Sequence, residues 1–231
     1  MSRYSELKQI AWECNQELPA RGLVTHTFGN ASAYDPESSV FAIKPSGVPF
    51  SELTAGQMVV VDLDYRVVDG NLKPSSDTKT HGLLYRHWSD LGGIVHTHSP
   101  YAVAWAQAMK PIPVLGTTHA DHLAQDIPCT AVMSDEMVTR DYEEQTGQQI
   151  LDALSGFSHA EVEMILVACH GPFAWGETPQ KAVENSYMLE MIARMAFHTL
   201  AINPDTPRLK DTLLRKHFER KHGPDAYYGQ P

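Results

Sequence analysis

The sequence has few cysteines and no long apolar run. Its three cysteines, Cys14, Cys129 and Cys169, are widely spaced among 231 residues and form no CxxC pair. This pattern excludes a disulfide framework and predicts reduced thiols in a cytoplasmic protein. No stretch approaches the roughly 18 apolar residues of a membrane span. Residues 1–22 carry scattered charges and lack the apolar centre of a signal peptide, so we expect no membrane association.

Positive charge is also scarce. Lys and Arg total 18 against 28 Asp and Glu, which gives a formal net charge of −10. Nucleic acids and membrane surfaces favour a basic face, so we expect neither as a partner. The exception is a basic segment at residues 208–223. Twelve histidines are many for so few Lys and Arg, and they direct attention to metal ligands.

The order of sequence patterns predicts one α/β domain over residues 1–231. Apolar residues at helical spacing predict a helix from Tyr4 to Leu18, and residues 57–70 are typical of two strands joined by a tight turn. Residues 133–154 are predicted as one helix, and a long amphipathic helix begins at Thr178. Strands and helices interleave without a repeat or a linker, which favours a layered α/β architecture.

Histidines stand where buried strands are expected to end. The segment "GGIVHTH" is a predicted strand before a helix from about Pro100, and His96 and His98 at i and i+2 would face the same side. His170 closes the apolar run "MILVACH", and Asp77 lies at the entry of a helix. Three imidazoles and one carboxylate suit Zn²⁺. The residues alone leave open a second interpretation, in which these histidines are hydrogen-bonded core residues. The other histidines singled out are expected on the surface or as satisfied core residues: His26, His81, His87, His119, His122 and His198.

Eight motifs together resemble one family. In chain order they are "LVTHTFGNAS", "IKPSGV", "KPSSDTKTH", "GGIVHTHS", "GTTHAD", "IPCT", "HGPFAWG" and "KHFERKHGPDAYYGQ". The chain resembles, from about residue 5 to Gln230, the L-ribulose-5-phosphate 4-epimerase family. That family belongs to the class II aldolase superfamily, which also includes L-fuculose-phosphate aldolase.

The resemblance implies a fold, an assembly and a metal. The fold is a three-layer α/β/α domain with a largely antiparallel central sheet. The assembly is a homotetramer with C4 symmetry, in which the active site lies between neighbouring subunits and the C-terminal segment of one completes the pocket of the next. The cofactor is Zn²⁺, with Mn²⁺ as the alternative, held by the residues that match Asp77, His96, His98 and His170.

The resemblance also implies a reaction on a small sugar phosphate. The C4 hydrogen of a ketopentose phosphate is not α to its carbonyl, but the C3–C4 bond is β to it and breaks by a retro-aldol step. This step leaves a zinc-bound dihydroxyacetone enediolate and glycolaldehyde phosphate. Rotation of the aldehyde and re-addition invert C4, which converts L-ribulose 5-phosphate to D-xylulose 5-phosphate in pentose catabolism, of arabinose, ascorbate or another source.

Two acid/base groups are implied for the proton transfers. Asp121 in "GTTHAD" and Tyr228 in "AYYGQ" match the family's pair, and His217 and Thr117 match residues that support it. Burial is expected to raise the pKa of Asp121.

Other matched positions imply a phosphate site. Small residues let backbone N–H groups approach an anion, a helix N-terminus attracts it, and a lysine adds charge. These positions are Gly29, Asn30, Lys44, Ser46, Gly47, Ser75 and Ser76, with Arg220 expected from a neighbouring subunit.

Two alternatives stay open beside the epimerase. The first is an aldolase that cleaves a sugar phosphate such as L-fuculose 1-phosphate; such aldolases have glutamate where this chain has Asp77, which favours the epimerase. The second is a non-catalytic domain with a structural metal. Phe28 stands where the family commonly has Trp, His122 and Leu123 depart from its aromatic pattern, and Pro231 is an addition. Because His122 and Leu123 directly follow Asp121, their departure from the family's pattern affects the local shape of the pocket and hence the sugar that it prefers.

Overall fold

A computed structural model describes residues 2–224 and 226–228, and it centres on one seven-stranded sheet. The strand order is β4-β3-β2-β1-β5-β7-β6, and every neighbouring pair is antiparallel. Gln230, where the resemblance ends, and Pro231 lie outside the described residues. The strands are β1 Asn30–Asp35, β2 Val40–Ile43, β3 Val59–Asp62, β4 Val67–Asp69, β5 Gly93–His96, β6 Met164–Val167 and β7 Gly171–Gly176. The helices are α1 Ser5–Ala20, α2 Thr78–His87, α3 Pro100–Gln107, α4 Thr117–Ala120, α5 Asp135–Arg140, α6 Tyr142–Ala153, α7 Pro179–Ile202 and α8 Asp211–His222, with short 3₁₀ turns at Phe50–Glu52 and Ala55–Gln57.

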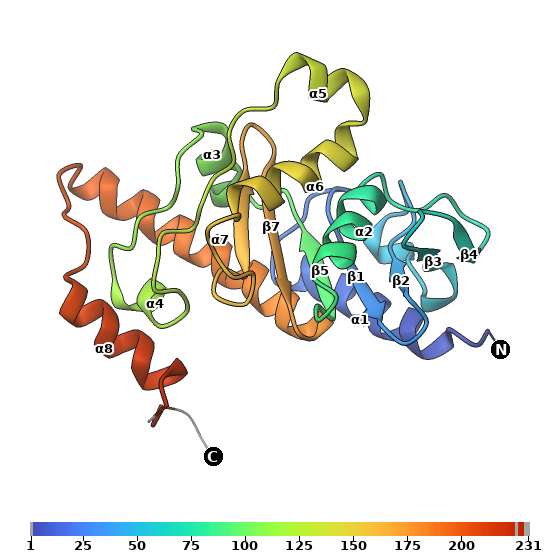
Figure 1. The fold of residues 1–231 in the computed structure, drawn as a ribbon, viewed down its shortest axis with the longest axis horizontal. Coiled ribbons are helices and arrows are strands. Elements are labelled where there is room, and N and C mark those ends of the chain that lie inside the picture. The colour runs from blue at the N-terminus through green and yellow to red at the C-terminus, as the bar shows by residue number, and fades with distance from the viewer. Residues whose placement is uncertain (1, 225, 229–231) are drawn as a thin grey trace.

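Helices cover both faces of the sheet (Figure 1). Side chains alternate along β2: Phe41 and Ile43 pack with residues of α2 and α6, whereas Val40 and Ala42 pack with residues of α1. This period of two is the pattern of a strand buried on both faces. Helices α3 and α7 cover β6 and β7 on the α1 side. The structure therefore confirms the predicted three-layer α/β/α architecture with an antiparallel sheet.

The predicted helix over residues 133–154 is wrong in one respect, because it is broken at Asp141. That residue has φ −152° and ψ 87°, outside the helical region, so α5 ends at Arg140 and α6 starts at Tyr142. Its carboxylate pairs with Lys79 of α2. Thr80 of α2 also donates to the backbone carbonyl of Glu143, at 2.5 Å. These contacts from α2 favour the break over a continuous helix.

Residues 23–29 form a loop, and β1 begins only at Asn30. Gly29 has φ +92°, and a Cβ there would lie 2.9 Å from the side chain of Val24 and 3.0 Å from the carbonyl oxygen of His96. Only glycine fits so close to β5 in this backbone conformation.

No helix among the described residues is both long and apolar enough to cross a membrane.

A buried glutamate fixes the segment after β5. Helix α3 starts at Pro100, directly after the residues that follow His96. The two carboxylate oxygens of Glu190, on α7, accept the backbone N–H groups of Tyr101 at 3.0 Å and Ala102 at 2.9 Å. A carboxylate at a helix N-terminus satisfies free N–H groups and complements the helix dipole. Glu190 therefore anchors α3 and the short segment that precedes it.

We expect Glu190→Gln to lower the free energy of unfolding by about 1–3 kcal/mol, because the amide keeps only one acceptor and loses the charge. Urea unfolding of the metal-free protein measures this. Glu184→Gln on the same helix is the control, since that side chain is exposed and its nearest cation, Lys181, lies 3.7 Å away. Equal stability of the two variants would contradict the anchoring role.

Candidate functional site

Three histidines from two separate segments converge at one end of β5. His96 is the last residue of β5, His98 lies two residues further on, and His170 lies in the turn between β6 and β7. One ligand atom from each lies within 4.8 Å of the others. His98 is beyond the end of the strand, so strand alternation alone does not place it. The structure nevertheless brings the three predicted histidines together.

These imidazoles have the form that binds a metal ion. Burial lowers the pKa of His96, and burial together with neighbouring imidazoles lowers the pKa values of His98 and His170, the last to about 4. The rings are therefore neutral near pH 7 and keep a free lone pair. His96 Nδ1 lies 2.9 Å from the carbonyl oxygen of Pro172, so it donates there and leaves Nε2 free to bind. The cluster fits a metal ion.

Asp77, the predicted fourth ligand, lies beside the cluster as the N-terminal cap residue of α2. Its carboxylate is not among the three mutually close ligand atoms. Asn30 Nδ2 donates to its Oδ2 at 2.6 Å. Burial alone would raise the pKa of this carboxyl, but His96, His81 and the Asn30 amide outweigh it, so the pKa lies below its usual value. The structure thus keeps a buried carboxylate at the wall of the histidine site.

One pocket of about 320 Å³ unites these residues with the predicted phosphate site. It is lined by every predicted metal ligand and by all the phosphate contacts expected from this subunit. Thr27, Phe28, Pro45, Tyr142 and Glu143 also line it. The full set of predicted residues is Gly29, Asn30, Lys44, Ser46, Gly47, Ser75, Ser76, Asp77, His96, His98 and His170.

Lys44 gives this pocket its positive charge. The side chain is 2% exposed, and no carboxylate pairs with it among the described residues. Its Nζ contacts the carbonyl oxygen of Pro45 at 3.4 Å and lies 4.8 Å from the centre of the Phe50 ring. Burial lowers the pKa of this lysine. An unpaired buried ammonium is costly, and an anion bound in the pocket would compensate for it.

Tyr142 and Glu143 line the pocket without having been predicted. The Tyr142 hydroxyl lies 3.2 Å from His170 Nδ1. Both residues sit inside the region predicted as one continuous helix, where nothing distinguished them from other helical positions. The break at Asp141 is what directs this end of α6 to the pocket. Phe28, identified only as a departure from the family, packs against His98 with ring centres 5.6 Å apart.

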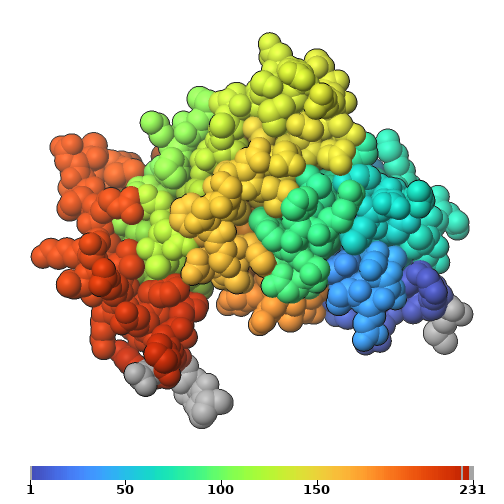
Figure 2. Space-filling model, viewed as in Figure 1, coloured from blue at the N-terminus to red at the C-terminus, as the bar shows by residue number. Residues whose placement is uncertain are grey.

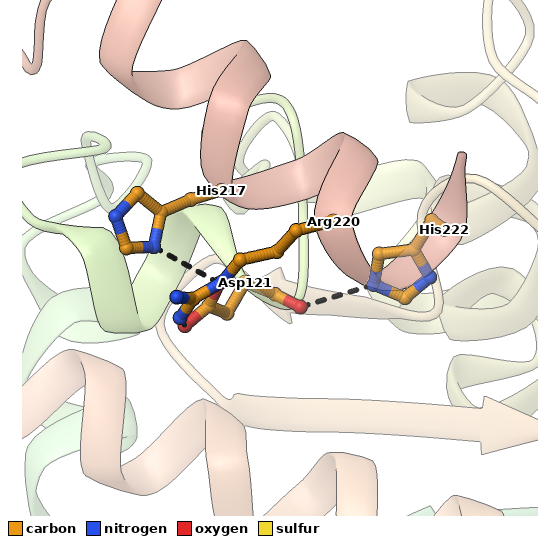
Figure 3. A network of polar contacts seen from close by, with 4 residues as sticks. All are labelled: Asp121, His217, Arg220 and His222. Atoms are coloured by element: carbon orange, nitrogen blue, oxygen red, sulfur yellow. Dashed lines mark hydrogen bonds and ion pairs between the residues drawn. The ribbon is translucent and has the colours of Figure 1, made fainter. Parts of the chain in front are cut away.

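Asp121, directly after α4, forms a second cluster with three residues of α8 (Figure 3). The Arg220 guanidinium donates to both oxygens of Asp121, at 2.9 and 2.6 Å, and His217 Nδ1 lies 3.1 Å from Oδ1. His222 Nε2 donates to the backbone carbonyl of Asp121 at 3.0 Å. Asp121 follows the single turn of α4, where its N–H donates to the carbonyl oxygen of Thr117. The exposed ring of Tyr228 lies under Arg220, 4.5 Å from the guanidinium carbon.

The expectation of a raised pKa at Asp121 is wrong for this chain on its own. Burial acts in that direction, but the hydrogen bonds from Arg220 and His217 outweigh it and hold the pKa of this carboxyl below its ordinary value. A bidentate guanidinium stabilises the charged form strongly. While this pair persists, Asp121 is a poor proton donor.

The two clusters do not share a pocket. A surface pocket at Arg220 is lined by residues of α8 and the segment after it, and none of these lines the histidine pocket. Helix α8 packs on α4 at one end of the molecule, away from α2 and β5 (Figure 1). The space-filling view shows the C-terminal segment as a projection at that end (Figure 2). One chain therefore holds two separate halves of the predicted site.

The fold and the histidine pocket agree with the comparison to known families. Residues 9–197 match the family described as Class II Aldolase and Adducin N-terminal domain, and the chain belongs to that family. The predicted class II aldolase relationship is confirmed.

Two curated relatives, each named L-ribulose-5-phosphate 4-epimerase UlaF, come from Salmonella paratyphi A and Salmonella typhi. Each is 50% identical over 97% of this chain and 99% of its own length. A solved structure named L-fuculose 1-phosphate aldolase has the same fold, with a TM-score of 0.79 and 24% identity over 95% of this chain and 97% of its own.

We expect Asp121→Asn to loosen α8, because the neutral amide cannot pair with the guanidinium of Arg220. Hydrogen exchange at pH 7 should be faster by about tenfold or more in the amides of α8, since charge-assisted hydrogen bonds are worth about 1.5–3 kcal/mol. The stabilisation by this carboxylate is fully present above its ordinary pKa of 3.8 and is lost as the pH falls through its lowered value. The amides of β5 serve as the internal control. Unchanged exchange in α8 would show that the ion pair does not hold it.

Proposed function

We propose that the protein is a metal-dependent epimerase that interconverts L-ribulose 5-phosphate and D-xylulose 5-phosphate at C4. The observation that carries the proposal is the pocket that combines three neutral, convergent imidazoles with the buried, unpaired Lys44. Such a pocket suits a substrate with oxygens for a metal at one end and a phosphate at the other. The two curated relatives with the epimerase name support the choice of substrate.

The reaction begins with loss of the 4-hydroxyl proton. The electrons of the C3–C4 bond then pass toward the C2 carbonyl, which gives dihydroxyacetone enediolate and glycolaldehyde phosphate. The aldehyde turns over while its phosphate remains bound, and the enediolate adds to its opposite face. The new 4-oxyanion takes up a proton. The result is inversion at C4 with no net change in atoms or electrons.

Residues of the histidine pocket hold the two fragments. Zn²⁺ or Mn²⁺, held by His96, His98 and His170 with Asp77 beside them, would supply Lewis acidity where negative charge develops on the enediolate. Lys44 and the N-terminus of α2 at Ser75 and Ser76 bind the phosphate. Gly29, Asn30, Ser46 and Gly47 complete its binding site. Retention of the phosphate keeps the aldehyde in the pocket during its rotation.

Asp121 and Tyr228 carry out the proton transfers from a neighbouring subunit. They lie outside the histidine pocket of their own chain, so they reach a substrate only if a second copy supplies them. A head-to-tail arrangement of this kind closes into a ring, consistent with a C4 homotetramer. In that assembly Arg220 adds positive charge at the phosphate, and its departure from Asp121 frees the carboxylate. His217 and Thr117 then orient Asp121.

An aldolase acting on L-fuculose 1-phosphate is the second candidate, favoured by the fold shared with that enzyme. Asp77 in place of glutamate argues against it. A structural metal in a non-catalytic domain is less consistent with three histidines that line a pocket and with no cysteine in their cluster. The three free cysteines support a cytoplasmic location.

We expect Zn²⁺-loaded protein to convert L-ribulose 5-phosphate to D-xylulose 5-phosphate and to release no dihydroxyacetone phosphate from L-fuculose 1-phosphate. A parallel assay of both substrates, before and after metal removal, measures this. Chelation should abolish the activity and added Zn²⁺ should restore it. Cleavage of the ketose 1-phosphate without epimerisation of the pentose would establish the aldolase instead.

A mixture of two inactive variants should recover activity if the site lies between subunits. His96→Asn removes the metal half and Asp121→Asn the proton-transfer half, so each variant alone should be inactive. Equal amounts, dissociated and reassembled together, should reach about a quarter of wild-type activity, because a quarter of the interfaces join two intact halves. The double variant reassembled with wild type is the control for dilution. A mixture that remains inactive would contradict the intersubunit site.

A further inference from the structure

His81 is a fully buried histidine next to the histidine pocket that no step above uses. It lies on α2 one turn after Asp77, and its backbone N–H donates to the Asp77 carbonyl oxygen at 3.0 Å. Residues four apart on a helix share a face, so its ring lies on the side of α2 that carries Asp77, although no hydrogen bond joins the ring to that carboxylate. The same ring packs edge-on against Phe173, which in turn stacks on His96 at 4.2 Å. The ring is thus part of the wall that supports the metal ligands.

The two ring nitrogens of His81 differ sharply. Nδ1 lies 2.7 Å from Ser32 Oγ, and Ser32 Oγ lies 2.7 Å from the Tyr85 hydroxyl. Nε2 is one of only three buried side-chain N or O atoms without a hydrogen-bond partner among the described residues. A second of the three is Asn30 Oδ1, whose own amide nitrogen holds Asp77. Unpartnered buried polar atoms are rare, and two of the three belong to residues close to Asp77: Asn30, whose amide nitrogen contacts the carboxylate, and His81, one helical turn along α2.

The hydroxyl chain determines which nitrogen carries the proton. Among the described residues Ser32 Oγ is the one hydrogen-bond partner of the buried Tyr85 hydroxyl, so the tyrosine proton has Ser32 Oγ as acceptor. Ser32 then donates to His81 Nδ1, which leaves the imidazole proton on Nε2. The opposite direction would bury a tyrosine O–H without an acceptor, and it would leave Nε2 without a proton to donate to Asp77. Both consequences are unfavourable.

We propose that His81 positions the Asp77 carboxylate at the metal centre, with its Nε2–H as the donor and the Tyr85–Ser32 chain as the device that keeps the proton on Nε2. Asn30 supplies the second donor to the same carboxylate. The Asn30 amide already holds the carboxylate, and the His81 Nε2–H, which has no partner here, would add the second hydrogen bond when Asp77 completes the coordination of a bound ion. The proposal rests on the proposed metal centre and not on the epimerase reaction. Its prediction therefore concerns metal affinity.

The test is Zn²⁺ affinity, measured by competition with a chromophoric chelator on the full-length protein. His81→Phe keeps the ring volume and removes both nitrogens, and it should weaken Zn²⁺ binding by about 10–100-fold, the usual effect of losing an outer partner of a ligand. Tyr85→Phe and Ser32→Ala should each weaken Zn²⁺ binding less, because the imidazole remains and its proton is only free to move from Nε2 to Nδ1. In the His81→Phe background, Tyr85→Phe should cause no further loss of affinity.

His119→Phe is the matched control. His119 is also buried and also has one nitrogen without a partner. Its other nitrogen, Nε2, donates to the backbone carbonyl of Gln125, and the residue lies away from the histidine pocket. This variant should lose stability without losing Zn²⁺ affinity. If His81→Phe fails to fold, Ser32→Ala and Tyr85→Phe carry the test.

Three results would overturn the proposal: wild-type Zn²⁺ affinity in His81→Phe, wild-type affinity in both hydroxyl variants, or additive losses in the double variant. Absence of metal binding by the wild-type protein would overturn it together with the metal centre. A wild-type protein that binds Zn²⁺ but does not epimerise L-ribulose 5-phosphate would contradict the proposed function alone, and the affinity comparison would stand.

Discussion

The register of three neighbouring strands is the constraint on which the histidine pocket depends. Asn30 of β1 lies directly opposite His96 of β5, and His96 lies opposite Phe173 of β7. A slip of one residue in either pair would turn the His96 imidazole away from the amide that holds Asp77 or from the ring that stacks on it. The close approach of Gly29 to the His96 carbonyl oxygen makes the first of these registers sensitive to any side chain at that position.

This register also explains how residues far apart in the chain form one pocket. β1 brings the loop of residues 23–29, β5 brings His96 and His98, and the turn before β7 brings His170. Helix α2 enters at the same end with Asp77 at its first turn, because its buried face packs under the sheet through Leu84 and Tyr85. The candidate metal site and the candidate anion site thus consist of residues at the ends of elements that the core already holds in place.

The sequence was sufficient to predict most of this pocket but not its environment. The motif with His96 and His98 pointed to this pocket, although His98 lies beyond the end of β5 and strand alternation alone does not place it. The matched motifs also contain the other predicted residues that line the pocket. Tyr142 could not be found in this way, because the helix break at Asp141 depends on contacts with α2 rather than on a local signal. His81 was expected to be a satisfied core residue, and its unpartnered Nε2 contradicts that expectation. Hydrogen-bond partners are set by tertiary packing, which periodicity does not describe.

The second cluster shows why the pKa of Asp121 could not be judged from burial. Burial and the Arg220 pair act in opposite directions, and the pair prevails because a guanidinium satisfies both carboxylate oxygens. A carboxylate tied in this way gains proton-transfer capacity only when another anion competes for Arg220. In the proposed assembly, the substrate phosphate in the neighbouring subunit's pocket is that anion, so the phosphate would serve both to retain the aldehyde and to release Asp121.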